Sequence, residues 1–506
     1  MTSRLVSART ARTPSEAKRK GWKSARGELS GERYAEGVAQ PGLALLLASL
    51  GTGLVLVVFA NVVSTVAPTI SALRGGASGE TWALSGMSLG LAAMLLSLGS
   101  VADDYGRRRV FLASNFALAA SSVLAAAAPA VWVFVAARIL QGAAGAGVVA
   151  SSLGLIGHAF PTGPARTWAT GIWGAAVGAG TAVGPLLGAG TALFGGWRAG
   201  YWVQASAATL LAVSALRLIE NRGLKPRPLD PWGAGLFALA MASLVAGLTL
   251  GREQWGRTST IGLLVLSFAL VAGFAVAERR ARSPMIDLAL FRQPLFLASA
   301  SGALFVGLAM VATVSFLPTF LERALHRSPL ASAGILALFS VTGTVVAFNV
   351  RRLPDRLDAG GQVVIGFLFG AFGLAGLSAL SPHSAWVRLI PGLILLGAGY
   401  GLANAALGRL AVESVPRARS GMGSGANNTA RYVGGAVGVA IVAVLLSAGD
   451  DQPGAAGLAH GWNLASAVAA LLSLLGAGLA LACRRAQRSH AQAPDLPPGP
   501  PRGRAA

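Results

Sequence analysis

Charged residues and cysteines are scarce in this chain. Only 12% of its 506 residues are Asp, Glu, Lys or Arg, and Cys483 is its one cysteine, so no disulfide can form within the chain. Hydrophobic residues make up 54%, and apolar runs of about 20 residues recur along nearly the whole length. A soluble protein of this size does not normally combine so little charge with so many apolar runs. The composition therefore predicts an all-α membrane protein with many transmembrane helices.

Fourteen apolar segments are long enough to cross a bilayer. We predict an N-terminal six-helix half over residues 42–218, an inserted helix pair over 231–277 and a C-terminal six-helix half over 294–483. The polar ends, 1–41 and 484–506, are predicted to be disordered cytoplasmic arms. The predicted spans are 42–70, 81–101, 110–128, 131–157, 166–193, 199–218, 231–250, 260–277, 294–321, 330–350, 361–380, 385–409, 420–448 and 461–483.

The basic residues are distributed unevenly between the two sides of these spans. Of the 41 lysines and arginines, 32 fall on the side of the N-terminus, seven fall on the other side, and Arg138 and Arg431 fall within spans. Because basic loops stay in the cytoplasm, this distribution predicts that both termini are cytoplasmic. It also accounts for the net charge of +22 without a nucleic-acid partner.

The link between the second and third predicted spans reads GSVADDYGRRRV over residues 99–110. Gly99 and Gly106 remove side chains where backbones must turn or approach closely. Arg107 and the two arginines after it hold the link on the cytoplasmic side, which a plain basic loop would also do. A buried Asp103 needs a cation or a helix N-terminus, and the glycine-rich start of the thirteenth span is a suitable site. We therefore predict that this link docks against the start of the thirteenth span.

Polar side chains within spans are candidates for coupling or substrate contact. Arg138 lies well inside the fourth span, where a guanidinium is costly unless it faces water or a partner. Gln141 lies one turn further along, on the same face of the helix. The alternative is a structural arginine that donates hydrogen bonds to backbone carbonyls. Asn61 in the first span and Asn404 in the twelfth are further polar candidates expected to face a cavity.

The fifth span contains a regular strip of small residues. Gly180, Gly184 and Gly188 lie four residues apart, which makes a smooth surface where another helix can pack closely. Pro185 lacks a backbone donor and is expected to kink or loosen the helix. A generic packing seam would have the same spacing, so both a functional and a structural interpretation stay open.

Acidic residues are missing from the middle of every span. All 19 lie in links, arms or near span ends, so the transmembrane carboxylate that usually carries protons is absent. Arg431, in the thirteenth span, either pairs with Glu413 just before that span or extends to the cytoplasmic surface. No zinc-ligand spacing, phosphate-binding loop or catalytic triad is visible, so the sequence predicts no metal, no cofactor and no enzyme activity.

These motifs resemble those of the major facilitator superfamily of transporters. The 99–110 link resembles the signature after its second span, Arg138 to Gly142 resembles its Arg-x-x-Gln-Gly motif, and Gly180 to Gly188 resembles the antiporter motif of its exporters. The resemblance covers roughly residues 42–483. It implies a fourteen-span drug:proton antiporter of the multidrug or antibiotic efflux branch, in a bacterial cytoplasmic membrane. It also implies that Gly99, Asp103, Gly106 and Arg107 form a conformational switch that is remade in each transport cycle. The sequence departs from this branch at Phe59, where proton-coupled members usually carry an aspartate.

The predicted function is export of small amphipathic drug-like compounds by alternating access and proton antiport, through a monomer in the lipid bilayer. With no acid at Phe59, either Glu413 or Asp103 takes protons, or transport runs down the substrate gradient alone. An uncoupled facilitator, or an exporter of an anionic metabolite attracted by Arg138, is the alternative within transport. A receptor or scaffold that moves no solute is the alternative from another class. Efflux assays with and without a proton uncoupler discriminate between these three hypotheses.

Overall fold

The computed structural model describes residues 41–160, 163–218, 230–251, 254–281, 284–352, 357–447 and 454–492. Thirteen helices in this part of the chain are long and apolar enough to cross a membrane. One of them, α6, contains two crossings, because its backbone leaves helical geometry at Gly195 and Gly196. Gly196 has a φ of 65°, a conformation that favours glycine. The prediction of fourteen spans is therefore confirmed.

The membrane-spanning helices follow the predicted apolar segments closely. α9 and α10 belong to one crossing, which a π-helical turn, η2 (Val306–Val311), interrupts. The bounds are α2 (Pro41–Ala72), α3 (Ala77–Tyr105), α4 (Arg107–Ala126), α5 (Val131–Ala159), α6 (Gly163–Ala215), α7 (Pro231–Gly251), α8 (Thr258–Arg280), α9 (Pro294–Phe305), α10 (Ala312–Arg323), α11 (Pro329–Asn349), α12 (Ala359–Gly376), α13 (Leu389–Glu413), α14 (Ser420–Ser447) and α15 (Ala455–Gln492).

The two ends of the chain had been predicted to be disordered arms. The C-terminal prediction is wrong for residues 484–492, because α15 continues as a helix to Gln492. Residues 1–40 and 493–506, which hold most of both predicted arms, lie outside the described residues.

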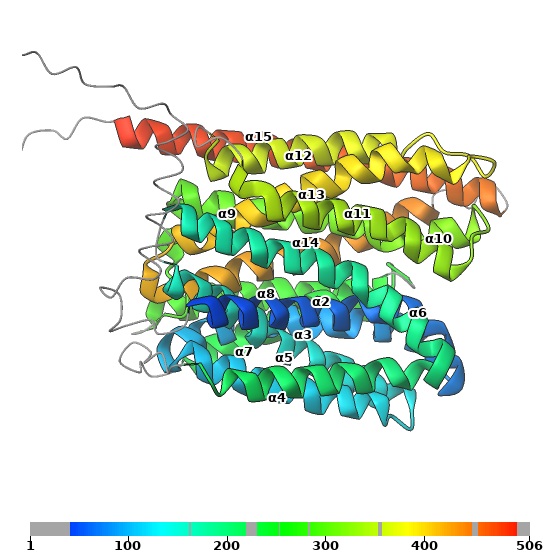
Figure 1. The fold of residues 1–506 in the computed structure, drawn as a ribbon, viewed down its shortest axis with the longest axis horizontal. Helices are drawn as coiled ribbons and strands as arrows, with labels where there is room; N and C mark the ends of the chain where they lie inside the picture. The colour runs from blue at the N-terminus through cyan, green and yellow to red at the C-terminus, as the bar shows by residue number, and fades with distance from the viewer. Residues whose placement is uncertain are drawn as a thin grey trace, which may run out of the picture.

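Two bundles of six crossings lie side by side (Figure 1). In the first, α2 packs on α6 and α3 on α5; in the second, α12 packs on α13 and α15. The bundles meet where α3 contacts α14 and where α6 contacts α11. The inserted helices α7 and α8 pack on each other, and α7 also contacts α3 and α14. This is the predicted arrangement of two six-helix halves with an additional pair.

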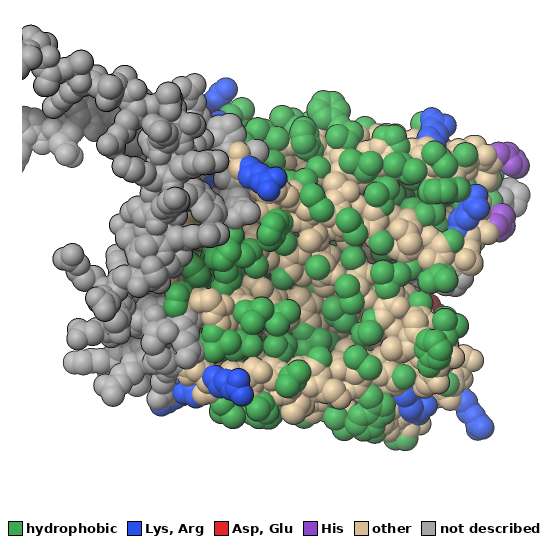
Figure 2. Space-filling model, viewed as in Figure 1, with side chains coloured by type: hydrophobic (Ala, Val, Ile, Leu, Met, Phe, Trp, Pro, Cys, Tyr) green, Lys and Arg blue, Asp and Glu red, His purple; other side chains and the backbone are tan. Residues whose placement is uncertain are grey.

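Hydrophobic side chains dominate the outer surface between the two ends of the bundle. On the face shown in Figure 2, Lys and Arg side chains lie toward the ends, and the broad band between them shows hydrophobic and uncharged side chains. Several large apolar side chains of this kind are highly exposed, such as Leu210 at 68% and Phe268 at 74%. Such a surface is stable against lipid rather than water.

Both described ends of the chain lie at the same end of the bundle (Figure 1). α2 begins there, α15 ends there, and the link between α3 and α4 lies there too. We call this end the Asp103 face, after the residue in that link. The opposite end, where α6 turns at Gly195 and Gly196, is called the far face.

Candidate functional site

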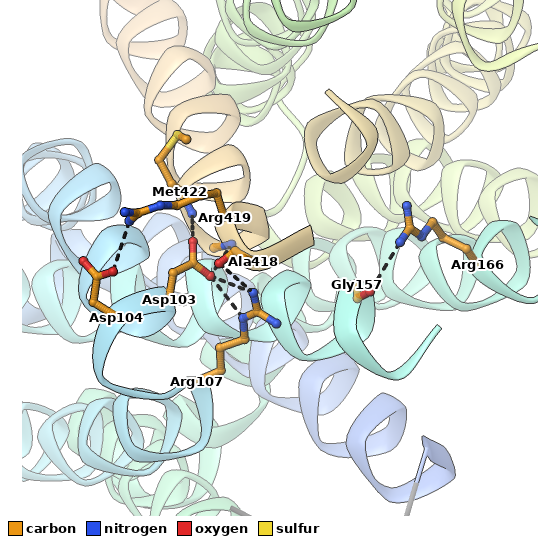
Figure 3. Close-up of polar contacts among 9 residues, drawn as sticks. Asp103, Asp104, Arg107, Gly157, Arg166, Ala418, Arg419 and Met422 are labelled. Atoms are coloured by element: carbon orange, nitrogen blue, oxygen red, sulfur yellow. Dashed lines mark hydrogen bonds and ion pairs between the residues drawn. The ribbon is translucent and has the colours of Figure 1, made fainter. Parts of the chain in front are cut away.

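Asp103, near the C-terminal end of α3, joins the two halves (Figure 3). Its carboxylate accepts hydrogen bonds from the backbone N–H groups of Gly421, at 3.0 Å, and Met422, at 2.8 Å, in the first turn of α14. Arg107 donates to the same carboxylate from Nε at 3.1 Å and from Nη2 at 2.8 Å. Asp103 is only 3% exposed, so this pairing offsets the penalty of burying its charge. The predicted contact with the thirteenth span is present.

Further contacts close the Asp103 face around this carboxylate. Arg419, just before α14, donates to Asp104 at 3.2 Å, and Arg107 also approaches the carbonyl oxygen of Ala418 at 3.4 Å. The backbones of α3 and α14 touch here, because a Cβ atom at Gly99 would lie 2.5 Å from the carbonyl oxygen of Gly421. The link thus seals the two halves against each other at this end. Gly106 has a φ of 108°, which allows the sharp turn from α3 into α4.

A cavity of about 420 Å³ lies between the halves and reaches the far face. Its wall comes from α2, α3, α5, α6, α7, η2, α10, α11, α13 and α14, so both halves and the inserted pair contribute. Aromatic side chains surround its inner end: Phe59, Trp173, Phe339, Tyr400 and Tyr432. Charged residues lie near the far face, where Glu80 is in the first turn of α3 and Glu322 and Arg323 are the last two residues of α10. The cavity is therefore open toward one face while the Asp103 face is closed.

Arg138 does not line this cavity. It is fully buried, and its Nη1 donates to the carbonyl oxygen of Val58 at 2.9 Å and to Oε1 of Gln141 at 2.8 Å. Its Nη2 approaches the carbonyl oxygen of Phe59 at 3.4 Å, and Gln141 donates in turn to Ser122 at 2.9 Å. Backbone carbonyls of α2 thus occupy the place of an acidic partner. The geometry matches the structural alternative, and a substrate in the cavity has no contact with Arg138 in this conformation.

The two asparagines expected to face a cavity do not line it, so that prediction is wrong. Asn61 is turned toward α6, where a Cβ atom at Gly188 would lie 2.8 Å from its Oδ1. Asn404 is buried, and its Nδ2 donates to the carbonyl oxygen of Tyr400 one turn earlier at 3.1 Å. Both amides lie on the packed side of their helices rather than on the side that meets the cavity.

The glycine strip of α6 packs against α2 of the same half. A Cβ atom at Gly184 would lie 2.7 Å from Cβ of Ala60, and one at Gly180 would overlap the carbonyl oxygen of Gly53. The helix continues through Pro185, which lines the cavity. The strip therefore fixes one wall of the cavity from behind, as the packing-seam alternative predicts.

Arg431 lines the cavity instead of following either predicted alternative. Its Nη2 donates to Oδ1 of Asn427 at 3.3 Å, and only 7% of its surface is exposed. Glu413 is the last residue of α13, exposed on the Asp103 face, whereas Arg431 lies eleven residues into α14, about 16 Å from its start. This separation along the bundle explains why the predicted pair with Glu413 does not form and why Arg431 does not reach the surface.

Several residues of the cavity were not singled out from the sequence. The aromatic residues Tyr400 and Tyr432, and the acids Glu80 and Glu322, lie on different helices that converge only in the folded bundle. In the sequence, these four residues are recognisable only as polar or aromatic residues within or beside apolar runs. That signal is common in membrane helices and does not identify which residues share a cavity.

The second half has its own acidic link, which makes different contacts. Asp358 caps α12 by accepting from the backbone N–H of Gly361 at 2.9 Å, and it pairs with Arg484 of α15 at 2.9 Å. Partial burial would raise the pKa of Asp358, but the bonds from Arg484 and Gly361 outweigh it, so this pKa lies below its ordinary value. These contacts stay within one half, whereas those of Asp103 cross between halves.

Two membrane-embedded halves around a central cavity, closed at one face, define a membrane transporter. The family model described as Major Facilitator Superfamily matches residues 42–439, and the chain belongs to this family. This confirms the predicted family and fold. The members of this family are transporters, so the chain is a multi-pass membrane transporter of small molecules and not an enzyme.

The chain is similar to several bacterial resistance proteins and to a solved transporter structure. It is 30% identical to the Multidrug resistance protein Stp of Mycobacterium tuberculosis, over 80% of this chain and 76% of that protein. It is 30% identical to the Puromycin resistance protein pur8 of Streptomyces alboniger, with 87% and 90% covered, and 29% identical to the Tetracenomycin C resistance and export protein of Streptomyces glaucescens, with 80% and 77% covered. The human organic anion transporter MFSD10 shares the fold, with a TM-score of 0.63, 18% identity, and 87% of this chain and 99% of that chain covered.

Proposed function

We propose that this chain is an efflux transporter that exports small amphipathic, drug- or antibiotic-like compounds across a bacterial cytoplasmic membrane. The central observation is the aromatic cavity between the halves, which reaches the far face while the Asp103 contacts close the other. The resistance and export proteins to which the chain is similar support the same function. A receptor or scaffold would not need a cavity of this kind between two movable halves.

Alternating access follows from this arrangement. The halves, residues 42–218 and 294–483, would tilt around the cavity, with the inserted pair 231–277 beside them. Asp103, Gly99, Gly106 and Arg107 would form the switch that makes and breaks the closed face in each cycle. Each chain contains a complete cavity, so we propose that a monomer transports.

Proton antiport is part of the proposal, although Phe59 replaces the usual acid. Of the two acids predicted to take protons, Glu413 does not line the cavity, and Asp103 is held by four hydrogen bonds. Glu80 and Glu322 line the cavity near the far face and are partly exposed. These two carboxylates are positioned to exchange protons from that side.

The function and its coupling are tested with the purified protein in liposomes. We expect an aromatic dye gradient to move protons in the opposite direction, and the double variant Glu80→Gln with Glu322→Gln to keep downhill dye movement while proton movement is lost. Glu413→Gln serves as the control and should retain both. If no dye moves, efflux is wrong; if dye moves without protons at any pH between about 5 and 8, the uncoupled facilitator is correct.

The orientation of the chain is a separate prediction. The excess of basic residues on the side of the Asp103 face predicts that this face, with both termini, is cytoplasmic. Reporter fusions after residues 225 and 282 should therefore report cytoplasm, and a fusion near Arg252 should report the outside. A reversed signal at any one of these three positions would contradict the topology.

A further inference from the structure

The inner end of the cavity holds a buried arginine with no acidic partner. Arg431 is 7% exposed and faces the cavity, and its Nη2 donates a 3.3 Å hydrogen bond to Oδ1 of Asn427. Its Nε has no hydrogen-bond partner, and none of the ion pairs in the described part of the chain includes it. A cation buried in this way is strongly stabilised when an anion enters beside it.

The backbone of Arg431 is held in place by the π-helical turn η2. A Cβ atom at Gly307 in that turn would overlap the carbonyl oxygen of Arg431, so the two backbones are in direct contact. Asn428, one residue past the hydrogen-bond partner Asn427, lines the cavity together with Arg431. The guanidinium is therefore presented from a tightly packed wall rather than from a loop.

The acids of the cavity lie at its other end. Glu80 is in the first turn of α3 and Glu322 is in the last turn of α10, next to Arg323, so all three stand near the far face. Among the described residues that line the cavity, Arg431 is the one charged side chain at the inner end. A ligand that enters fully meets positive charge there, without a nearby carboxylate to neutralise it.

Aromatic rings flank this charge. Phe59 and Tyr432 are in edge-to-face contact with ring centroids 6.0 Å apart, and Phe339 and Tyr400 lie 5.1 Å apart. Trp173 packs behind this wall, fully buried, and its Nε1 donates to Thr52 at 3.0 Å. Rings in such positions bind flat aromatic groups by edge and face contacts.

We propose that the preferred substrates are amphipathic aromatic compounds that carry a negatively charged oxygen, a carboxylate or a phenolate, which pairs with the Arg431 guanidinium. This inference names the substrate class of the proposed efflux function. Its claim about transport rests on that function, whereas its claim about binding to Arg431 does not. A guanidinium forms strong charge-assisted hydrogen bonds with anionic oxygens, whereas a cationic compound of the same shape meets an unpaired like charge. The anionic-substrate alternative thus gains its cation from Arg431 and not from Arg138.

Matched xanthene dyes test this directly. Fluorescein is anionic at neutral pH and rhodamine 123 is cationic, while the ring systems are alike. We expect the purified full-length protein to bind fluorescein roughly tenfold more tightly than rhodamine 123, measured by fluorescence polarisation, and to transport it preferentially in liposomes. Binding and transport are measured separately, so that each can succeed without the other.

Variants of the wall identify the residue responsible. Arg431→Gln should abolish the preference for fluorescein, and Arg431→Lys should retain part of it because the charge remains. Asn428→Asp places a carboxylate beside Arg431 and should shift the preference toward rhodamine 123. Arg388→Gln removes one exposed positive charge outside the cavity and should leave the preference unchanged. Gel filtration shows which variants remain folded, and Arg431→Lys and Asn428→Asp keep the test decisive if Arg431→Gln does not fold.

The possible outcomes separate the two proposals. Tight, Arg431-dependent binding of fluorescein without any flux supports the substrate class and contradicts efflux. Flux of rhodamine 123 with no preference for fluorescein supports efflux and overturns the substrate class. A preference for fluorescein that survives in Arg431→Gln and Asn428→Asp also overturns it.

Discussion

Replacing Asp103 by asparagine is expected to reduce efflux roughly tenfold or more while the protein still folds and reaches the membrane. The carboxylate accepts four hydrogen bonds, two from Arg107 and one each from the backbone of Gly421 and Met422. Asparagine keeps the shape of the side chain but removes its charge. Its NH₂ group would also face the N–H donors of Arg107 or α14, with which it cannot form a hydrogen bond. Arg107, 7% exposed, would then lose its ion pair with this carboxylate. The closed form of the Asp103 face loses stability, and the conformational cycle is impaired.

The measurement is dye efflux from cells, normalised to the amount of transporter in the membrane. Asp358→Asn is the matched control, because its side chain is 46% exposed and its contacts with Gly361 and Arg484 stay within one half. It should change efflux by less than about twofold, since exposed ion pairs contribute little. Full efflux in Asp103→Asn would rule out the proposed switch.

Replacing Gly180 by alanine is expected to destabilise the folded transporter strongly. The new Cβ atom would overlap the carbonyl oxygen of Gly53 and lie 2.8 Å from Cβ of Leu56, so α2 must move away from α6. Overpacking of this kind costs about 1–3 kcal/mol, and backbone overlap places this variant toward the upper end. α2 and α6 both contribute to the cavity wall, so efflux should fall together with stability.

Gly190 in the same helix provides the control. A Cβ atom there meets nothing within 4 Å, so Gly190→Ala should be neutral or stabilising by up to about 1 kcal/mol through helix propensity. Tm in detergent and the amount of protein in the membrane are measured for both variants. An unchanged Tm in Gly180→Ala would show that the glycine strip is not a packing seam.

The sequence correctly predicted contacts that depend only on local features, such as a short motif or the end of a helix. Asp103 was expected at the start of the thirteenth span because a buried carboxylate needs donors and a glycine-rich helix N-terminus supplies them. Arg138 and Gln141 were expected to share a face because they lie three residues apart in a helix, and they form a hydrogen bond. Such inferences succeed because helix geometry and the penalty for burying charge are local.

Predictions of which side of a helix faces the cavity were less successful. Asn61 and Asn404 were expected in a cavity, but each faces its packed neighbours. Arg431 was placed near the surface or beside Glu413, but it lies deep in the cavity wall. Spans that are apolar all round carry little periodic signal, so the sequence does not indicate which side of each helix meets the cavity.

The sequence by itself determined that this chain crosses the membrane fourteen times, because apolar length and backbone hydrogen bonding leave no other solution in lipid. The grouping of the spans into two halves with an inserted pair followed from the resemblance to the family. Its motifs also determined the family and the residue that joins the halves. Only the tertiary structure decided that Arg431 and the aromatic residues share one cavity, that Arg138 is sealed outside it, and that the α6 glycines fit against α2. Those facts depend on side-chain packing between distant helices, which is decided by close steric fit and not by the order of residues along any single helix.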